Sequence, residues 1–248
     1  MNALESYRKN NVYSQAGEDG VIAEVFRRLG IKTGWFCEFG AWDGKYGSNC
    51  YALLKSGWRG VMIEGNTKRF EVLKKTARRH DGKLYIENAY VQHEGQQDTL
   101  DQLLSNTPIP SNFELLSIDI DGFDYRVWNS LQSYRPICVI IEIDSSTPPG
   151  EEYVYDGSGR LTSFSAMLKL GYEKGYVLVC HTGNMFFLDR DYVERLDLPA
   201  DLLQSPEKLF VREWVNPSRS SVILRKLRFL TWHRALCKIQ NTWREKHG

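Results

Sequence analysis

The sequence lacks an excess of charge of either sign, since 32 Lys and Arg stand against 31 Asp and Glu and the formal net charge is +1. General nucleic-acid binders are usually basic overall, so no nucleic-acid partner is expected. The 20 glycines and 8 prolines are too few for a collagen-like or low-complexity chain. With 42% apolar residues, the 248-residue chain has enough hydrophobic side chains to fold around one sizeable core.

Paired cysteine motifs and long apolar runs are also lacking. The five cysteines are odd in number and include no CxxC pair, which argues against a disulfide scaffold or a zinc ribbon. Cys37, Cys138 and Cys180 lie in strand-like apolar stretches, which favours buried free thiols in a reducing compartment. The longest uncharged, mostly apolar run has 13 residues, 176–188, whereas a membrane span needs about 20. These features, with the polar N-terminus at 1–11, predict a cytoplasmic protein.

Strand-like and helix-like patterns alternate along most of the chain. Short apolar strands are predicted at 35–39, 60–64, 83–87, 114–119 and 137–143, and amphipathic helices at 17–30, 49–56, 67–79, 98–105, 125–131 and 162–170. Thr67 is the predicted N-cap of its helix. This alternation indicates an α/β fold with a mostly parallel sheet and helices on both faces. Only four residues join the runs 176–180 and 185–188, so these two must form an antiparallel hairpin.

The C-terminal part has a different pattern and divides the chain into two predicted domains, 1–215 and 216–248. Residues 212–248 contain nine Lys and Arg against two Glu, interleaved with Leu, Ile and Trp. We interpret 216–248 as a basic amphipathic helical extension. Packing or self-association through this segment is the plainest interpretation, and binding to an anionic membrane surface or to nucleic acid is the alternative.

The segment 36–44, FCEFGAWDG, follows a predicted strand and carries the most information about function. Gly40 and Gly44 permit close approach of the backbone to a ligand, and Glu64 at the end of the next strand could accept both hydroxyls of a ribose. Neither GxGxxG nor GxxxxGK[ST] is present, so a dinucleotide or ATP phosphate cradle is not indicated. Glu38 and Asp43 would repel a pyrophosphate but suit a nucleoside with a positive centre.

Several motifs together resemble the class I S-adenosylmethionine-dependent methyltransferases, and among them the FkbM-type O-methyltransferases. They are YSQAGED at 13–19, FCEFGAWDG at 36–44, SN at 48–49, GWRGVMIE at 57–64, LSIDIDG at 116–122 and the hairpin at 181–187. The resemblance implies a Rossmann-like, seven-stranded, mostly parallel sheet with an antiparallel C-terminal hairpin strand. It also implies S-adenosylmethionine as cofactor and, as acceptor, a hydroxyl of a saccharide or a glycosylated small molecule.

The resemblance also assigns roles to individual residues. Glu38, Gly40 and Gly44 would lie by the methionine portion of the cofactor, Gln15 and Asn49 would hold its amino acid end, Glu64 would bind the ribose, Asn88 and Ala89 would flank the adenine, and Asp43 and Asp119 complete the predicted cofactor set. One departure is Gly65-Asn66, where similar proteins often have Pro-Asn.

Carboxylates gather after the fourth and fifth predicted strands. Asp119 and Glu142, with Asp121 or His181, are predicted to hold Mg²⁺ or Mn²⁺ and to orient a substrate hydroxyl. His181 is the predicted general base, because its ordinary pKa is about 6.5, and Asp121 is the competing base. The long segment 145–160 is the predicted acceptor lid, where Tyr153 and Tyr155, with Trp42, could stack on a sugar.

Two alternatives remain from the sequence. Asp119-Ile-Asp121 ends a strand in D-x-D, a pattern that also suits a metal-dependent glycosyltransferase, although that interpretation leaves Glu38, Gly40 and Glu64 unexplained. The second alternative is a non-enzymatic interaction module that acts through the basic extension 216–248.

Overall fold

A computed structural model describes residues 4–95 and 97–212 of the chain. The chain divides into two units, 1–213 and 214–248, and only the first is described below. The predicted extension 216–248 and Cys237 lie outside the described residues, so the boundary after residue 215 stays a prediction. Within the described residues, no helix is long and apolar enough to cross a membrane.

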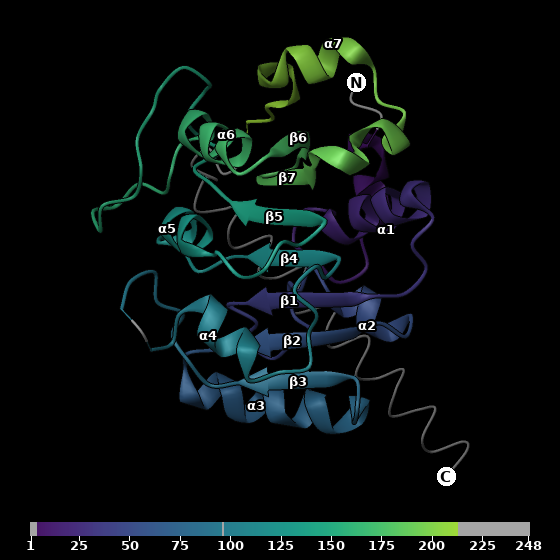
Figure 1. Cartoon of the computed structure of the whole chain (residues 1–248), viewed down its shortest axis with the longest axis vertical. Coiled ribbons are helices and arrows are strands. Elements are labelled where there is room, and N and C mark those ends of the chain that lie inside the picture. The colour runs from purple at the N-terminus through teal and green to yellow at the C-terminus, as the bar shows by residue number, and fades with distance from the viewer. Residues whose placement is uncertain (1–3, 96, 213–248) are drawn as a thin grey trace, which may run out of the picture. The chain divides into compact units, whose positions relative to one another are not determined.

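The described unit is built on a seven-stranded sheet of order β3-β2-β1-β4-β5-β7-β6, which confirms the predicted fold class (Figure 1). The strands are β1 Trp35–Phe39, β2 Arg59–Ile63, β3 Leu84–Glu87, β4 Leu115–Ile118, β5 Cys138–Glu142, β6 Tyr176–His181 and β7 Asn184–Asp189. The first five pair in parallel, and β7 is antiparallel to both β5 and β6. The predicted hairpin is therefore present, with only residues 182 and 183 between its strands.

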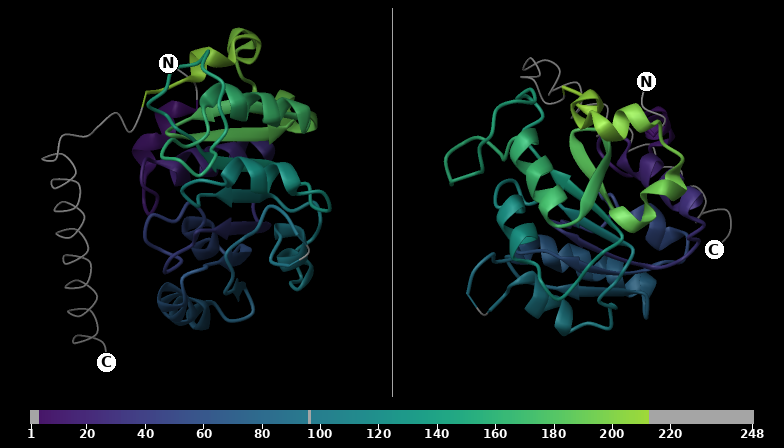
Figure 2. Two further views of the ribbon diagram at one scale, coloured as in Figure 1. Left: turned by 90° about the vertical axis from the view of Figure 1, so that its left-hand side faces the viewer. Right: turned by 45° about the horizontal axis from the view of Figure 1, so that its top comes forward.

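Helices cover both faces of this sheet (Figure 2). The α-helices are α1 Glu18–Leu29, α2 Tyr51–Lys55, α3 Thr67–Ala77, α4 Leu100–Ser105, α5 Asp124–Ser130, α6 Phe164–Glu173 and α7 Ala200–Gln204. The short 3₁₀ helices are η1 Glu5–Asn10, η2 Arg78–His80, η3 Arg190–Leu196 and η4 Pro206–Leu209. Apolar side chains of α1, α2 and α3 form one buried cluster, and those of α4, α5 and α6 form a second.

The central strands are apolar on both sides because each side contacts one of these clusters. In β4, Leu115 contributes to the cluster below α1–α3 while Leu116 contributes to the cluster below α4–α6. Burial of one such leucine side chain stabilises the fold by roughly 1.5–3 kcal/mol. The predicted buried free thiols are confirmed, since Cys37, Cys138 and Cys180 are free and buried.

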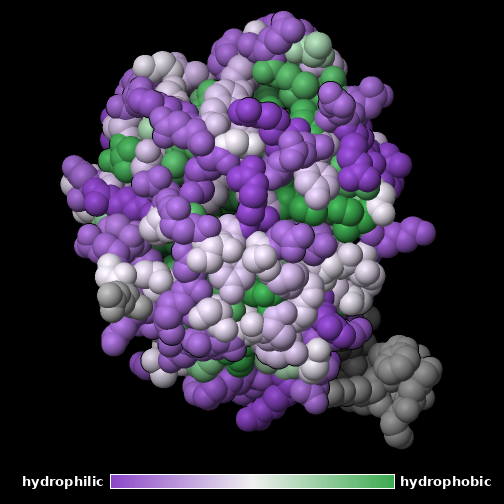
Figure 3. All heavy atoms as spheres, in the orientation of Figure 1, coloured by the Kyte–Doolittle hydropathy of each residue, from purple (hydrophilic) through white to green (hydrophobic). Residues whose placement is uncertain are grey.

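Helix α3 shows one local difference from the sequence prediction. Its N-cap is Asn66, whose side chain accepts hydrogen bonds from the amides of Lys68 and Arg69, so the prediction of Thr67 is wrong by one residue. Asn competes well for this position because its short side chain reaches the free amides of the first turn. Hydrophilic side chains cover the outer surface of α3 along the lower edge of Figure 3.

Candidate functional site

The carboxyl ends of four parallel strands form one edge of the sheet, on the left in Figure 1. In register, Phe39 of β1 lies beside Ile63 of β2 and Ile118 of β4, and Ile118 lies beside Ile141 of β5. The residues that follow these positions are therefore neighbours at the edge. They include Gly40, Glu64, Asp119 and Glu142, all of which the sequence assigns to the site.

Gly40 makes the close approach between β1 and β4 possible. Its φ is +77°, and a Cβ atom at this position would lie 1.9 Å from the carbonyl oxygen of Asp119. Only glycine meets both requirements, since a side chain is strained at positive φ and has no space here. The need for glycine at position 40 comes from the contact with the β4 end itself.

The carboxylate of Glu64 is held at the end of β2 by the loop that follows β1. Its Oε2 accepts a hydrogen bond of 2.8 Å from the amide of Trp42, and its Oε1 accepts one of 2.7 Å from the amide of Asn66. Trp42 adopts a φ of +49°, an uncommon backbone conformation for a tryptophan. Glu64 is thus buried and oriented with acceptor lone pairs still unused.

Glu38 lies one residue before the end of β1 and fixes the chain that returns from the edge. Its carboxylate accepts hydrogen bonds from the Ser48 hydroxyl at 2.6 Å and from the Asn49 amide at 2.7 Å. The side chain of Asn49 in turn donates to the Ser117 hydroxyl. Burial raises the pKa of Glu38 to about 7, against the lowering effect of these hydrogen bonds. Glu38 and Asn49 thus form a buried polar network below the predicted cofactor site.

The other predicted residues of the loop after β1 have local structural contacts. The Asp43 carboxylate accepts hydrogen bonds from the amides of Lys45 and Tyr46. A Cβ atom on Gly44 would lie 2.6 Å from a methyl carbon of Leu73, so this glycine allows the loop to pack on α3. Their predicted contacts with a cofactor stay predictions.

The N-terminal motif YSQAGED places Gln15 against the same loop. Asp19 accepts hydrogen bonds from the amides of residues 12, 13 and 14, which fixes the turn before α1. Ser14 forms a bridge with Gly47, and the Gln15 side chain lies 3.2 Å from the position that a Cβ atom of Gly47 would occupy. Gln15 is exposed beside this loop, as the prediction for the amino acid end of the cofactor requires.

Asn88 and Ala89 follow β3 and lie next to the Glu64 segment. The Asn88 side-chain amide donates a hydrogen bond of 2.7 Å to the backbone carbonyl of Glu64. The ring of Tyr90 covers Gly65 so closely that a Cβ atom there would lie 2.3 Å from it. Position 65 is therefore glycine rather than the proline of similar proteins because the Tyr90 ring occupies the space that a proline side chain would need.

Three carboxylates meet where β4 and β5 end. Asp119, Asp121 and Glu142 each offer an oxygen within 4.8 Å of the others. Oε2 of Glu142 is buried and has no hydrogen-bond partner among the described residues. Burial, and then the charges of the neighbouring carboxylates, raises the pKa of both Asp119 and Glu142. The sequence prediction that these three residues come together is confirmed.

Asp124 controls the loop that carries Asp121. One of its carboxylate oxygens accepts from the amide of Ile120, and the other accepts from the amide of Gly122 at 2.8 Å. Asp121, between them, has a φ of +56° and an exposed side chain. Asp124 is thus buried at the start of α5, and its carboxylate fixes the 120–122 loop.

His181 lies apart from this acidic group and is fully buried at the end of β6. Its Nδ1 accepts a hydrogen bond of 2.9 Å from the amide of Val211, and its Nε2 lies 3.0 Å from the hydroxyl of Ser145. The ring stacks on Phe210, and burial lowers the pKa of His181 to about 3. The structure does not bring His181 into the candidate metal group, and its assignment as general base stays a prediction.

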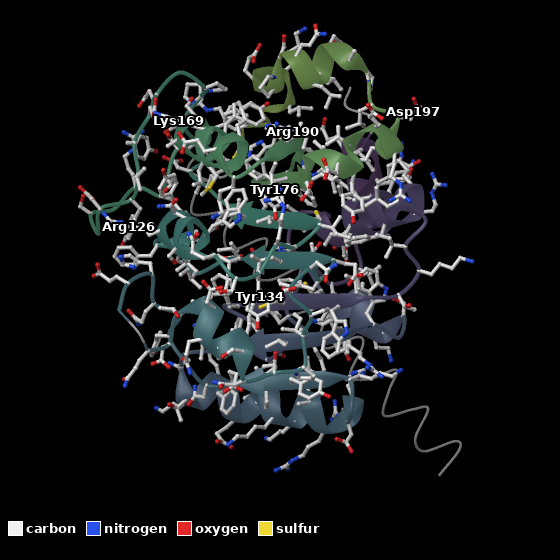
Figure 4. All side chains as sticks on the ribbon, in the orientation of Figure 1. Arg126, Tyr134, Lys169, Tyr176, Arg190 and Asp197 are labelled. Carbon is white, nitrogen blue, oxygen red and sulfur yellow. The ribbon has the colours of Figure 1, made fainter. Side chains whose placement is uncertain are left out.

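An aromatic wall, formed by His93, Phe123 and Tyr155, lies beside the acidic group. The His93 and Phe123 rings stack with centres 5.0 Å apart, and Tyr155 meets Phe123 edge-on at 5.1 Å. The guanidinium of Arg126, labelled in Figure 4, lies 5.9 Å from the Phe123 ring centre. The sequence analysis named Tyr155 but not His93 or Phe123. Only Phe123 had a signal in the sequence, namely its position directly after IDIDG.

The two remaining predicted stacking residues lie elsewhere. The Tyr153 hydroxyl donates a hydrogen bond to Asp144, and its ring lies under the Arg160 guanidinium at 4.2 Å. Hydrogen bonds from Ser146 and other hydroxyls lower the pKa of Asp144 to about 2, although burial alone would raise it. Trp42 is 42% exposed and packs against Tyr46. Tyr153 thus belongs to the scaffold of the 145–162 loop.

Comparison with known families gives one match. Residues 74–178, less than half of the chain, match the family model described as the methyltransferase FkbM domain. The matched range contains the acidic group and the aromatic wall, and it lies between Glu64 and His181. No curated protein sequence matches the chain.

Comparison with solved structures gives matches at low sequence identity. WbdD is 16% identical over 77% of this chain and 41% of its own, with a TM-score of 0.45. A TehB-like SAM-dependent methyltransferase from Corynebacterium glutamicum is 10% identical over 75% of this chain and 97% of its own, with a TM-score of 0.43. The chain thus spans about two fifths of the length of WbdD.

Proposed function

We propose that this chain, a class I methyltransferase of the FkbM type, transfers a methyl group from S-adenosylmethionine to a hydroxyl of a saccharide or a glycosylated small molecule. One observation carries the proposal. The loop after β1 presents an amide that holds the buried carboxylate of Glu64 at the end of β2, beside the Gly40 turn. In open parallel sheets, ligands bind at this edge, near the point where the strand order reverses.

The residues at this edge suit S-adenosylmethionine. Glu64 retains lone pairs for the two hydroxyls of a ribose, and Asn88 orients the adjoining chain through its bond to the Glu64 carbonyl. When bound, the cofactor supplies a methyl group on a positively charged sulfur, which an edge rich in carboxylates favours. The prediction that Gln15 holds the amino acid end agrees with its exposed position against the Gly47 turn.

The aromatic wall supports a saccharide as the acceptor. Phe123 is 38% exposed and lies two residues after Asp121. The apolar face of a sugar ring can pack on an aromatic ring, while carboxylates accept hydrogen bonds from its hydroxyls. The combination of an exposed ring and carboxylates at one place suits a polyhydroxylated ligand better than a purely apolar one.

In the proposed methyl transfer, the side chains of this protein position the acceptor and remove its proton. Most of the acceleration comes from holding the acceptor oxygen in line with the methyl–sulfur bond, which a wall and fixed carboxylates can do. The acceptor hydroxyl must also lose its proton, and we assign Asp121 as the base. Its side chain is exposed, and the two hydrogen bonds of Asp124 hold its loop in place.

The acidic group also fits a divalent cation. Its donors are all carboxylate oxygens, which Mg²⁺ and Mn²⁺ prefer, and Oε2 of Glu142 is buried without a partner among the described residues. A bound cation would lower the pKa of an acceptor hydroxyl. We expect titration calorimetry to detect Mn²⁺ binding that is lost in Asp119→Asn and kept in the exposed control Asp156→Asn. Equal Mn²⁺ affinity in both variants would exclude a metal role for this group.

Binding of S-adenosylhomocysteine tests the main proposal. Calorimetry with the full chain should show saturable binding, and Glu64→Gln should weaken it at least tenfold, because charge-assisted hydrogen bonds are worth about 1.5–3 kcal/mol. The control Glu71→Gln changes an exposed carboxylate on α3 and should leave the affinity unchanged. Circular dichroism would verify that Glu64→Gln is folded. Absence of binding to the unmodified chain would refute the proposal.

The same experiment addresses the glycosyltransferase alternative. Asp119 and Asp121 of the D-x-D sequence both belong to the acidic group, which keeps this alternative open. A metal-dependent glycosyltransferase would bind a nucleotide sugar with Mn²⁺ and would not bind S-adenosylhomocysteine. The third possibility, an interaction module acting through residues 216–248, lies outside the described residues.

A further inference from the structure

Basic side chains gather on the surface formed by α2, η2 and the loop after β1. Lys45 lies in that loop, Lys55 ends α2, Arg79 and His80 belong to η2, and Lys83 directly precedes β3. We call these five residues the basic patch. The five come from three segments of the chain, namely the loop after β1, α2 and residues 79–83, which the fold brings to one surface.

The ring of Tyr51 lies at the centre of the basic patch. The Lys45 ammonium lies 5.7 Å from the Tyr51 ring centre, and the His80 ring meets Tyr51 edge-on with centres 5.7 Å apart. Tyr13 packs on the same ring from another direction, at 4.8 Å. The patch therefore has a rigid aromatic floor, with Lys55, Arg79 and Lys83 exposed around it.

The patch is not neutralised by the protein around it. Within residues 4–95 and 97–212, none of its members forms an ion pair with a carboxylate. Burial, and then the positive charges of the other four members, lowers the pKa of His80. Burial and the charge of Arg79 lower the pKa of Lys45 in the same way, while Asp43 acts in the opposite direction. A bound anion would relieve this repulsion.

We infer that the basic patch binds a diphosphate group. Its four cations together with the adjoining Arg78 give five positive charges, and Asp43 and Asp81 subtract two, which leaves three positive charges. A single phosphate group carries about −1.5 to −2 charges at neutral pH, so two linked phosphates match the patch better than one. Lysine and arginine are the side chains that bind phosphate oxygens, and the Tyr51 floor restricts the space below the ligand.

Lys45 lies in the loop after β1, which also carries Asp43 and Gly44 of the predicted cofactor set. The other four members of the basic patch lie in α2, in η2 and just before β3, and none of them is assigned to methyl transfer. The acidic group lies where β4 and β5 end. The inference therefore does not rest on the proposed function. The diphosphate source is either a soluble molecule or a lipid headgroup, and the two are separated below.

The test uses the full chain and inorganic pyrophosphate in titration calorimetry. The triple variant Lys55→Gln, Arg79→Gln, Lys83→Gln removes three exposed charges, and we expect at least a tenfold loss of pyrophosphate affinity. The control variant Arg190→Gln, Arg195→Gln, Lys208→Gln removes the same charge from η3 and η4 and should bind within about twofold of the unmodified chain. Both variants keep residues 213–248, so that segment contributes equally to the two.

A second measurement keeps the inference independent of variant folding. In the unmodified chain, pyrophosphate should raise the pKa of the His80 imidazole, followed by nuclear magnetic resonance, since an anion stabilises its charged form. The S-adenosylhomocysteine affinity should be equal in all three proteins, which separates the patch from the methyl-transfer site. Absent pyrophosphate binding, or an equal loss in both triple variants, would overturn the inference.

Co-sedimentation with vesicles identifies the source of the phosphate. Vesicles of phosphatidylcholine with diacylglycerol pyrophosphate, whose headgroup is a diphosphate, should pellet the unmodified chain and the control, but not the patch variant, if the ligand is a lipid headgroup. Pyrophosphate binding without patch-dependent pelleting identifies a soluble diphosphate instead.

Discussion

Glu38 gives the sharpest test of how the candidate site is built, because a near-isosteric substitution removes its ionisable group. Its carboxylate is buried and accepts from the Ser48 hydroxyl and the Asn49 amide. In Glu38→Gln, the amide oxygen can still accept from the Asn49 amide. The side-chain nitrogen faces the Ser48 hydroxyl, whose oxygen already accepts from the amides of Cys50 and Tyr51, so the hydrogen bond from Ser48 is lost. One hydrogen bond is thus kept while the ionisable group is removed.

The sign of the pH effect follows from the direction of the pKa shift. Burial raises the pKa of Glu38 from 4.5 to about 7, so the folded chain binds a proton that the unfolded chain releases. The stability from this proton is fully present below about pH 4.5 and is lost as the pH rises through about 7. Between about pH 5 and about pH 8, this single group should lower the free energy of unfolding by about 2 to 3 kcal/mol.

Urea denaturation of both proteins at several pH values would measure this difference. Subtraction of the two profiles removes the contribution of groups that do not interact with Glu38, such as His181. The unmodified chain should lose its advantage over Glu38→Gln as the pH rises, and the variant should be the more stable protein above about pH 7. Parallel profiles would show that Glu38 is not a desolvated carboxylate and would refute the reasoning.

Two further predictions concern the scaffold of the site. Gly40→Ala should lower the free energy of unfolding by about 3 kcal/mol, because the alanine combines a positive φ with a clash against the Asp119 carbonyl. The control Gly82→Ala also has a positive φ, +71°, but its Cβ atom would lie in open space, so it should cost only about 1 kcal/mol. Urea denaturation measures both differences. Equal losses would mean that the β1–β4 approach tolerates a side chain. His181→Ala should lower the free energy of unfolding by about 3 kcal/mol, because the Val211 amide loses its acceptor and a cavity opens. Unchanged stability with lost methyl transfer would instead favour the predicted role of His181 as general base.

Hydrophobic periodicity predicted the sheet well because the central strands are buried on both faces. Runs such as WFCEF at 35–39 are too apolar to be exposed and too short to be buried helices, and β1 has the predicted bounds. The four residues between 180 and 185 admitted only an antiparallel connection, which the pairing of β6 with β7 confirms. Errors occur at element ends, where single side chains compete for free amides, as Asn66 and Thr67 illustrate.

Glycine patterns predicted a candidate site at the loop after β1, and the structure shows what surrounds these glycines. The sequence indicated that Gly40 and Gly44 admit a ligand, whereas the structure shows Gly40 against the Asp119 carbonyl and Gly44 against Leu73. A glycine in the sequence indicates that a side chain does not fit at that position. It does not show which atom occupies the space, because that atom belongs to a segment distant in the sequence. Sequence alone could not separate approach to a ligand from approach to the chain itself.

The acidic group and His181 show which chemical assignments a sequence can support. Asp119 and Glu142 follow adjacent parallel strands, so topology alone brings them together, and the structure does so. His181 ends a strand beyond the antiparallel β7, where its side chain lies among Phe164, Phe210 and Ser145. The sequence pattern places His181 in the connection between 180 and 185, but β6 continues through it and the segment around Val211 covers it. The position of a residue at the end of a parallel strand therefore predicts which side chains meet more securely than its residue type does. This favours our proposal of Asp121, on the 120–122 loop, as the base.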